Sequence, residues 1–142
     1  MIGLVAGTFQ ILHEGHKNYI ETGFRFCDFV YIVLATSKYA NKKYKVKNIN
    51  IRKEQIVKYL KSLNIEKDRY KFIKIDNEIS LRNSISQNKI NIAIVTPEYI
   101  NFMRKINLET DSNYYILMIE KIKNSDGNDL NTIQLMENNN EM

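Results

Sequence analysis

The order of apolar runs in residues 1–35 leaves few choices of fold. Residues 2–6 form a short apolar run that ends at Gly7, and residues 29–35 form a second run rich in β-branched and aromatic side chains. Between them, Tyr19, Ile20 and Phe24 recur at a spacing that predicts a helix over residues 15–26. A strand, a helix and a second strand in this order predict two parallel strands joined by a right-handed crossover.

The same alternation continues along the chain. Further helices are expected over residues 50–63, with Asn50 as N-cap, and over 80–87, and a third is opened by Thr96, Pro97 and Glu98; further strands are expected over 70–75, 90–95 and 113–121. Residues 124–127 predict a turn, and residues 137–142 a frayed tail. The pattern predicts one α/β domain over residues 1–142, an open, mostly parallel, five-stranded sheet with helices on both faces.

The apolar runs, the first residues and the cysteine count limit the cellular location and the cysteine chemistry that we expect. The longest apolar run, residues 29–35, has 7 residues, whereas a membrane-spanning helix needs roughly 20. The first residues carry no secretory signal pattern, so a cytoplasmic protein with no membrane partner is expected. The single cysteine, Cys27, has no second cysteine to pair with and is interpreted as a small core residue.

The net charge of +5 is concentrated in one short stretch, which contains Lys38, Lys42, Lys43, Lys45 and Lys47. Such a run is either a solvated loop or a site for anions. The 9 tyrosines are scattered rather than interleaved with basic residues, so a nucleic-acid surface is disfavoured and a small anionic partner is preferred.

The sequence that follows the first strand carries the clearest signal. Gly7, Thr8 and Phe9 close the strand, and His13, Gly15 and His16 lie at the start of the first helix. Backbone N–H groups and the dipole at a helix start attract phosphate. Imidazole rings, whether neutral or protonated, are expected to donate hydrogen bonds to phosphate oxygens, and a glycine lets a ligand approach the backbone. We therefore predict a phosphate site at this junction.

Gly-Thr-Phe followed by His-x-Gly-His resembles the signature of the HxGH nucleotidyltransferase superfamily, which has a Rossmann-like sheet. Members transfer AMP or CMP from a nucleoside triphosphate to a phosphorylated acceptor and release pyrophosphate. The later segments, residues 36–52, 93–98 and 105–107, resemble the archaeal and eukaryotic type of phosphopantetheine adenylyltransferase. That resemblance implies AMP transfer from ATP to 4′-phosphopantetheine, which gives dephospho-coenzyme A.

The resemblance also implies residue roles. His16 would contact the α-phosphate, and Lys42 would neutralise charge in the transition state. Nucleotide or phosphate contacts would come from Gly7, Thr8, Phe9, His13, Gly15, Lys43, Arg52, Thr96, Glu98, Asn131 and Thr132. No protein metal site is expected, because no carboxylate cluster with ligand spacing is visible, and Mg²⁺ would arrive with ATP.

Two departures from the superfamily pattern keep other functions open. Gln10 stands where an aspartate is usual, and Gln134 and Met136 stand where two arginines are usual. Glutamine cannot replace the charged, bidentate bonds of arginine to phosphate. The alternatives are therefore a transferase for nicotinamide mononucleotide, flavin mononucleotide or a CTP-dependent acceptor, or a nucleotide-binding homologue with weakened or lost catalysis.

Overall fold

The computed structural model describes residues 1–40 and 45–120. In chain order the elements are β1 (Ile2–Gly7), α1 (Glu14–Phe26), β2 (Phe29–Ala35), α2 (Ser37–Ala40), α3 (Ile49–Ser62), η1 (Lys67–Arg69), β3 (Tyr70–Ile75), α4 (Glu78–Gln87), β4 (Ile92–Val95), η2 (Pro97–Tyr99), α5 (Ile100–Thr110) and β5 (Tyr115–Met118). The two η elements are single 3₁₀ turns.

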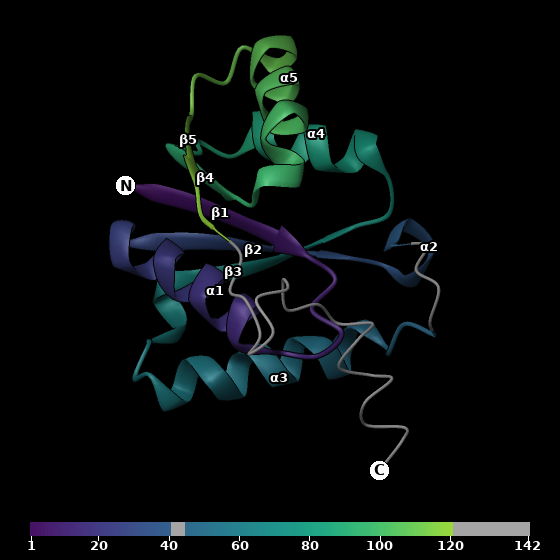
Figure 1. Cartoon of the computed structure of the whole chain (residues 1–142), viewed down its shortest axis with the longest axis vertical. Coiled ribbons are helices and arrows are strands. Elements are labelled where there is room, and N and C mark those ends of the chain that lie inside the picture. Colours follow the sequence, from purple (N-terminus) through teal and green to yellow (C-terminus); the bar gives the residue numbers. More distant parts are fainter. Residues whose placement is uncertain (41–44, 121–142) are drawn as a thin grey trace.

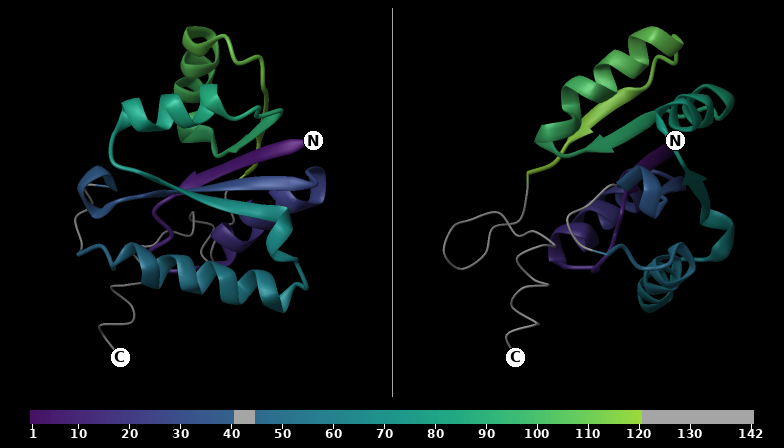
Figure 2. Two further views of the ribbon diagram at one scale, coloured as in Figure 1. Left: turned by 180° about the vertical axis from the view of Figure 1, so that it is seen from behind. Right: turned by 90° about the vertical axis from the view of Figure 1, so that its right-hand side faces the viewer.

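The strands form one sheet in the order β3-β2-β1-β4-β5, and all four pairings among the described strands are parallel. Helices α4 and α5 cover one face, and α1 and α3 cover the other (Figure 1). The side view in Figure 2 shows the same two helical layers on either side of the strands. The predicted α/β architecture, a Rossmann-like sheet with helices on both faces, is confirmed.

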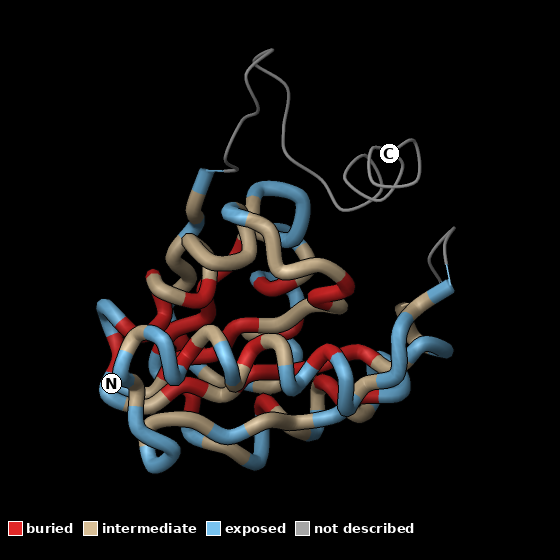
Figure 3. Tube along the Cα trace, turned by 90° about the horizontal axis from the view of Figure 1, so that it is seen from below, coloured by how far each residue is buried: buried red, intermediate tan, exposed pale blue. Residues whose placement is uncertain are grey.

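Two apolar clusters hold these layers together. One lies between the sheet and α4 and α5, and includes Leu81, Ile85 and Ile106; the other lies beneath α1 and α3, and includes Ile20 and Leu60. Figure 3 shows the buried segments gathered in the interior of the molecule, with exposed segments mostly at its periphery. A sheet buried on both faces explains the nearly continuous apolar runs of the inner strands.

Several predicted boundaries are wrong in instructive ways. Helix α3 begins before residue 50, and its N-cap is Asn48 rather than the predicted Asn50. The side chain of Asn48 accepts a hydrogen bond from the backbone N–H of Asn50 (2.8 Å). Pro97 opens the short turn η2 rather than α5, and the Thr96 side chain makes no capping hydrogen bond there. The last two strands are shorter than predicted, covering residues 92–95 and 115–118.

Within the part of the chain that the structure describes, no helix combines the length and the apolar composition that crossing a bilayer requires.

Candidate phosphate-binding site

The predicted site lies where the strand order reverses. Strand β1 is the first in sequence but lies in the middle of the sheet, between β2 and β4. In open parallel sheets, ligands bind outside the carboxyl ends of the strands at this reversal. The β1–α1 loop, residues 8–13, leaves the sheet at this point, and Figure 1 shows α2 following β2 at the same edge.

The side chain of Tyr19 connects strands β1 and β4 near this edge of the sheet. Strand β1 pairs with β2 over its whole length but with β4 only at Gly3 and Leu4. Beyond that, the Tyr19 hydroxyl accepts the N–H of Ala6 (3.0 Å) and donates to the carbonyl of Ile94 (2.8 Å). Burial raises the pKa of Tyr19, which keeps this bridging hydroxyl protonated. The Tyr19 hydroxyl thus bridges β1 and β4 at the point where direct backbone pairing between these two strands ends.

Replacing Tyr19 with phenylalanine is expected to lower the free energy of unfolding by about 1–3 kcal/mol, because Ala6 and Ile94 lose their shared partner. Urea denaturation measures the change. Tyr115→Phe is the matched control, since Tyr115 is 74% exposed, and it is expected to change stability by less than about 0.5 kcal/mol. Equal stability of the two variants would contradict the bridging role of Tyr19.

The turn that follows β1 is strained and tightly packed. Phe9 has a φ of 52°, a left-handed conformation that a bulky residue rarely adopts, and it is only 1% exposed. Its ring lies against Gly7, where a Cβ atom would come within 3.2 Å of Phe9 Cε2. The same ring meets the edge of the His16 ring, with 5.1 Å between centroids. The Phe9 ring therefore fills the space beside Gly7 that a larger side chain would need, and it supports the His16 ring.

His13 is the N-cap of α1. Its Nδ1 accepts the N–H groups of Gly15 (3.0 Å) and His16 (3.3 Å), so the neutral ring carries its proton on Nε2. A Cβ atom on Gly15 would come within 2.8 Å of the His13 ring, so the glycine makes room for the cap. The N–H groups of Gly15 and His16, which were expected from the sequence to bind phosphate, thus donate to His13. The group that the His13 ring can donate to a phosphate is its Nε2–H.

His16 has the opposite tautomer. Its Nδ1 lies 2.7 Å from the carbonyl oxygen of Ile11, and a carbonyl only accepts, so this nitrogen carries a proton. A neutral His16 ring then has only a lone pair on Nε2, and it donates to a phosphate from Nε2 only as the imidazolium. This corrects the expectation that either protonation state would donate. The two rings stack with 3.8 Å between centroids, so they lie face to face at the start of α1.

The His13 cap predicts a pH dependence of stability. Burial lowers the pKa of His13 from its ordinary value of 6.5, so as the pH falls through 6.5 the unfolded chain takes up a proton that the folded chain does not. Stability from this group is therefore present above pH 6.5 and lost below it. His13→Asn keeps a cap that does not titrate, so its stability should match the wild type at pH 7.5 and exceed it at pH 5.5.

Urea denaturation at the two pH values measures this difference. His13→Gln is the companion variant, because its longer side chain moves the acceptor away from the cap, and it should be about 1 kcal/mol less stable than His13→Asn at pH 7.5. Parallel pH profiles for the wild type and His13→Asn would show that the His13 cap does not couple stability to pH.

The buried side chain of Arg52 hydrogen-bonds the backbone of three separate segments of the site. It is 1% exposed, and its guanidinium donates to the carbonyl oxygens of Thr8, Ala35 and Lys47, each at 2.8 Å. These residues belong to the β1–α1 loop, the end of β2 and the approach to α3. The resemblance implied a phosphate contact for Arg52 but did not predict these backbone contacts. Its predicted phosphate contact stays a prediction.

Gln10 is a site residue whose role sequence reasoning missed. Its side chain is 2% exposed, its Nε2 donates to the carbonyl of Lys45 (3.1 Å), and its Oε1 accepts the N–H of Lys47 (2.8 Å). The sequence marked position 10 only as a departure from the superfamily pattern. The lysine segment, residues 45–47, is thereby fixed to the β1–α1 loop.

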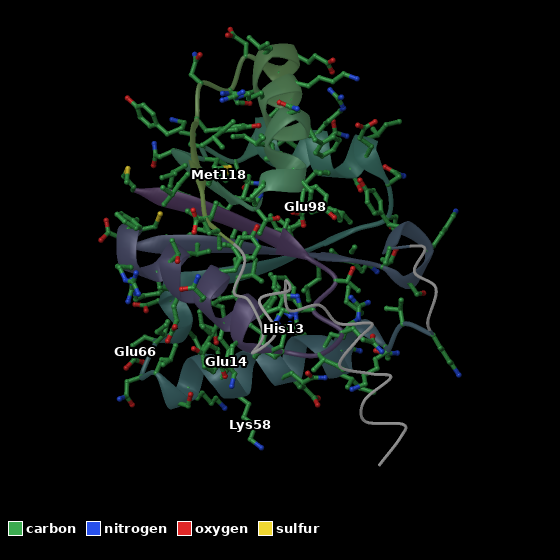
Figure 4. All side chains as sticks on the ribbon, in the orientation of Figure 1. His13, Glu14, Lys58, Glu66, Glu98 and Met118 are labelled. Carbon is green, nitrogen blue, oxygen red and sulfur yellow. The ribbon has the colours of Figure 1, made fainter. Side chains whose placement is uncertain are left out.

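The remaining predicted residues divide into two groups. Figure 4 labels His13, on the α1 side of the sheet, and Glu98, on the α5 side. Thr96 and Glu98 follow β4, the strand next to β1, and Glu98 is exposed. The other group lies outside the described residues: Lys42, Lys43, Asn131, Thr132, Gln134 and Met136, together with the predicted turn and tail. Among the described residues, no group of three or more His, Cys, Asp or Glu side chains is arranged to hold a metal ion.

Comparison with known proteins identifies the family of this chain. The cytidylyltransferase-like family matches residues 4–139. Phosphopantetheine adenylyltransferase from Methanosarcina mazei is 30% identical over 105 residues, which cover 72% of this chain and 66% of the relative. The Methanosarcina barkeri protein of the same name is also 30% identical over 105 residues, with 72% and 63% covered. The chain thus spans slightly less than two thirds of each relative.

Solved structures share the fold. A protein of unknown function from Archaeoglobus fulgidus has a TM-score of 0.69 at 20% identity, over 92% of this chain and 98% of that chain. A bifunctional NMN adenylyltransferase/ADP ribose pyrophosphatase from Francisella tularensis has a TM-score of 0.68 at 15% identity, over 87% of this chain and 39% of that chain.

A Rossmann-like sheet that carries paired histidines at the head of its first helix defines the class of HxGH nucleotidyltransferases. Within that class, the chain belongs to the cytidylyltransferase-like family.

Proposed function

We propose that this protein transfers AMP from ATP to 4′-phosphopantetheine, which gives dephospho-coenzyme A and pyrophosphate. The observation that carries the proposal is the pair of stacked histidines, one fixed as an Nε2–H donor by capping α1 and the other fixed with Nδ1 on the carbonyl of Ile11. The similarity to relatives named phosphopantetheine adenylyltransferase supports this choice of acceptor.

In the proposed reaction, a phosphate oxygen of the acceptor attacks the α-phosphorus of ATP in line. The new P–O bond forms while the bond between the α-phosphorus and the bridging oxygen breaks, and pyrophosphate leaves with that electron pair. The protein needs no covalent intermediate, because positioned cations and donors stabilise the charge on the non-bridging oxygens. The His16 imidazolium would donate from Nε2 to the α-phosphate, and neutral His13 would donate from Nε2 alongside it.

The remaining site residues keep the roles that the resemblance implies. Thr8 and the backbone around Gly7, Phe9 and Gly15 would surround the phosphates, and Thr96 and Glu98 would line the adenine side of the crevice. Four further roles rest on the sequence alone: Lys42 and Lys43 would neutralise phosphate charge, and Asn131 and Thr132 would hydrogen-bond phosphate. Mg²⁺ would enter with ATP, held by the phosphates of the nucleotide, and would lower the charge of the departing pyrophosphate.

The test is pyrophosphate release by the purified protein with ATP or CTP and a panel of acceptors. The panel contains 4′-phosphopantetheine, nicotinamide mononucleotide and flavin mononucleotide. The proposal expects the highest kcat/KM for ATP with 4′-phosphopantetheine. A higher value for another pair would assign the protein to a different branch of the family, and absence of pyrophosphate with every pair would overturn the transferase proposal.

A second candidate function is nucleotide binding without turnover. It is favoured by Gln134 and Met136, which stand where the resemblance leads us to expect arginines. Calorimetry separates the two candidates, because this second function predicts ATP binding with no product from any acceptor in the panel.

A further inference from the structure

The buried amide of Gln10 makes a backbone-like pair of bonds with the lysine segment. It donates to the carbonyl of Lys45 and accepts the N–H of Lys47, across sequence separations of 35 and 37 residues. This is the donor and acceptor pattern that one strand residue offers to a neighbouring strand. A glutamate in the same place would lack the donor, and a methionine of similar length would lack both groups.

Arg52 attaches the same segment at a third point. Its Nε donates to the carbonyl of Lys47, while its Nη1 donates to the carbonyl of Thr8 in the β1–α1 loop. The backbone of the segment is therefore tied to the loop that carries the two histidines. The side chains of Lys45 and Lys47 are exposed. Two ammonium groups are thus attached to a fixed backbone beside the proposed phosphate site.

We propose that Gln10 is a positioning residue: its amide holds the lysine segment against the β1–α1 loop, so that Lys45 and Lys47 bind the oxygens of a polyphosphate. This inference deepens the proposed function and rests on it. It assigns Gln10 a role that requires an amide, and it gives Lys45 and Lys47 a role in binding that the motif does not include.

Hydrogen exchange tests the attachment without any ligand. The Lys47 amide should exchange at least tenfold faster in Gln10→Met than in the wild type, since its acceptor is lost. Gln10→Glu keeps an acceptor for Lys47 and loses only the donor to Lys45, so its Lys47 amide should stay protected. Gln87→Glu is the charge-matched control, because Gln87 is exposed on α4, which covers the opposite face.

Binding of inorganic pyrophosphate, measured by calorimetry, tests the consequence. Gln10→Met should weaken binding roughly tenfold, as expected when bonds to charged groups are lost. Replacing Lys45 and Lys47 together with alanine should weaken binding in the wild type but have no further effect in Gln10→Met. Such non-additivity shows that Gln10 acts through the lysines, and additive effects would overturn the inference.

The outcomes separate this inference from the proposed function. Equal pyrophosphate affinity in Gln10→Met and the wild type, or no pyrophosphate binding by the wild type, would overturn the positioning role. A protein that binds pyrophosphate in a Gln10-dependent way but releases none from ATP with any acceptor would support the positioning role and overturn the proposed function.

Discussion

Replacing His16 with asparagine is expected to lower kcat for pyrophosphate release by roughly 100- to 1,000-fold, the usual effect of losing one donor to transition-state charge. Asparagine can still donate to the carbonyl of Ile11, where His16 Nδ1 now donates. It cannot supply the Nε2–H of the imidazolium. The fold should therefore survive while the rate falls, and steady-state kinetics together with a circular dichroism spectrum measure both.

Arg25→Gln, at the exposed far end of α1, is the control and should keep the wild-type kcat. Wild-type kcat in His16→Asn would contradict the assignment.

Replacing Arg52 with methionine is expected to lower the free energy of unfolding by about 2–4 kcal/mol, since three carbonyl oxygens lose charged donors at a buried position. Arg52→Lys should recover only part of this loss, because one ammonium group cannot span carbonyls that a planar guanidinium reaches. Urea denaturation measures both variants.

The control for Arg52 is Arg104→Met, which removes an exposed arginine from α5. It should change stability by less than about 0.5 kcal/mol. Arg52→Met with the stability of Arg104→Met would show that the guanidinium does not hold the three segments together.

The fold was predictable because its signals are local. Each apolar run and each helical stripe lies within a few residues, and parallel pairing follows from their alternation. Boundaries failed where one side chain decides them, as at Asn48, which caps α3 two residues before the predicted N-cap. The 3₁₀ turn after Thr96 failed similarly, because proline at a first helical position does not distinguish a 3₁₀ turn from an α-helix.

The site was predictable only as far as the motif extends. The spacing of His13, Gly15 and His16 located it, but the spacing could not show that Gly15 leaves room for the His13 ring, or that the two rings carry opposite tautomers. Gln10 bonds a segment 35 and 37 residues away in sequence, and Arg52 reaches Thr8, which is 44 residues away. Such contacts exist only once the sheet has brought the β1–α1 loop and the approach to α3 together.

In the proposed reaction an adenylyl group, not a terminal phosphate, moves to the acceptor. The protein should be incubated with 4′-phosphopantetheine and ATP labelled with ³²P at either the α or the γ position. We expect the α-label to appear in dephospho-coenzyme A and the γ-label to appear only in pyrophosphate. Transfer of γ-label to the acceptor, or retention of both labels in ATP, would rule out the proposed adenylyl transfer.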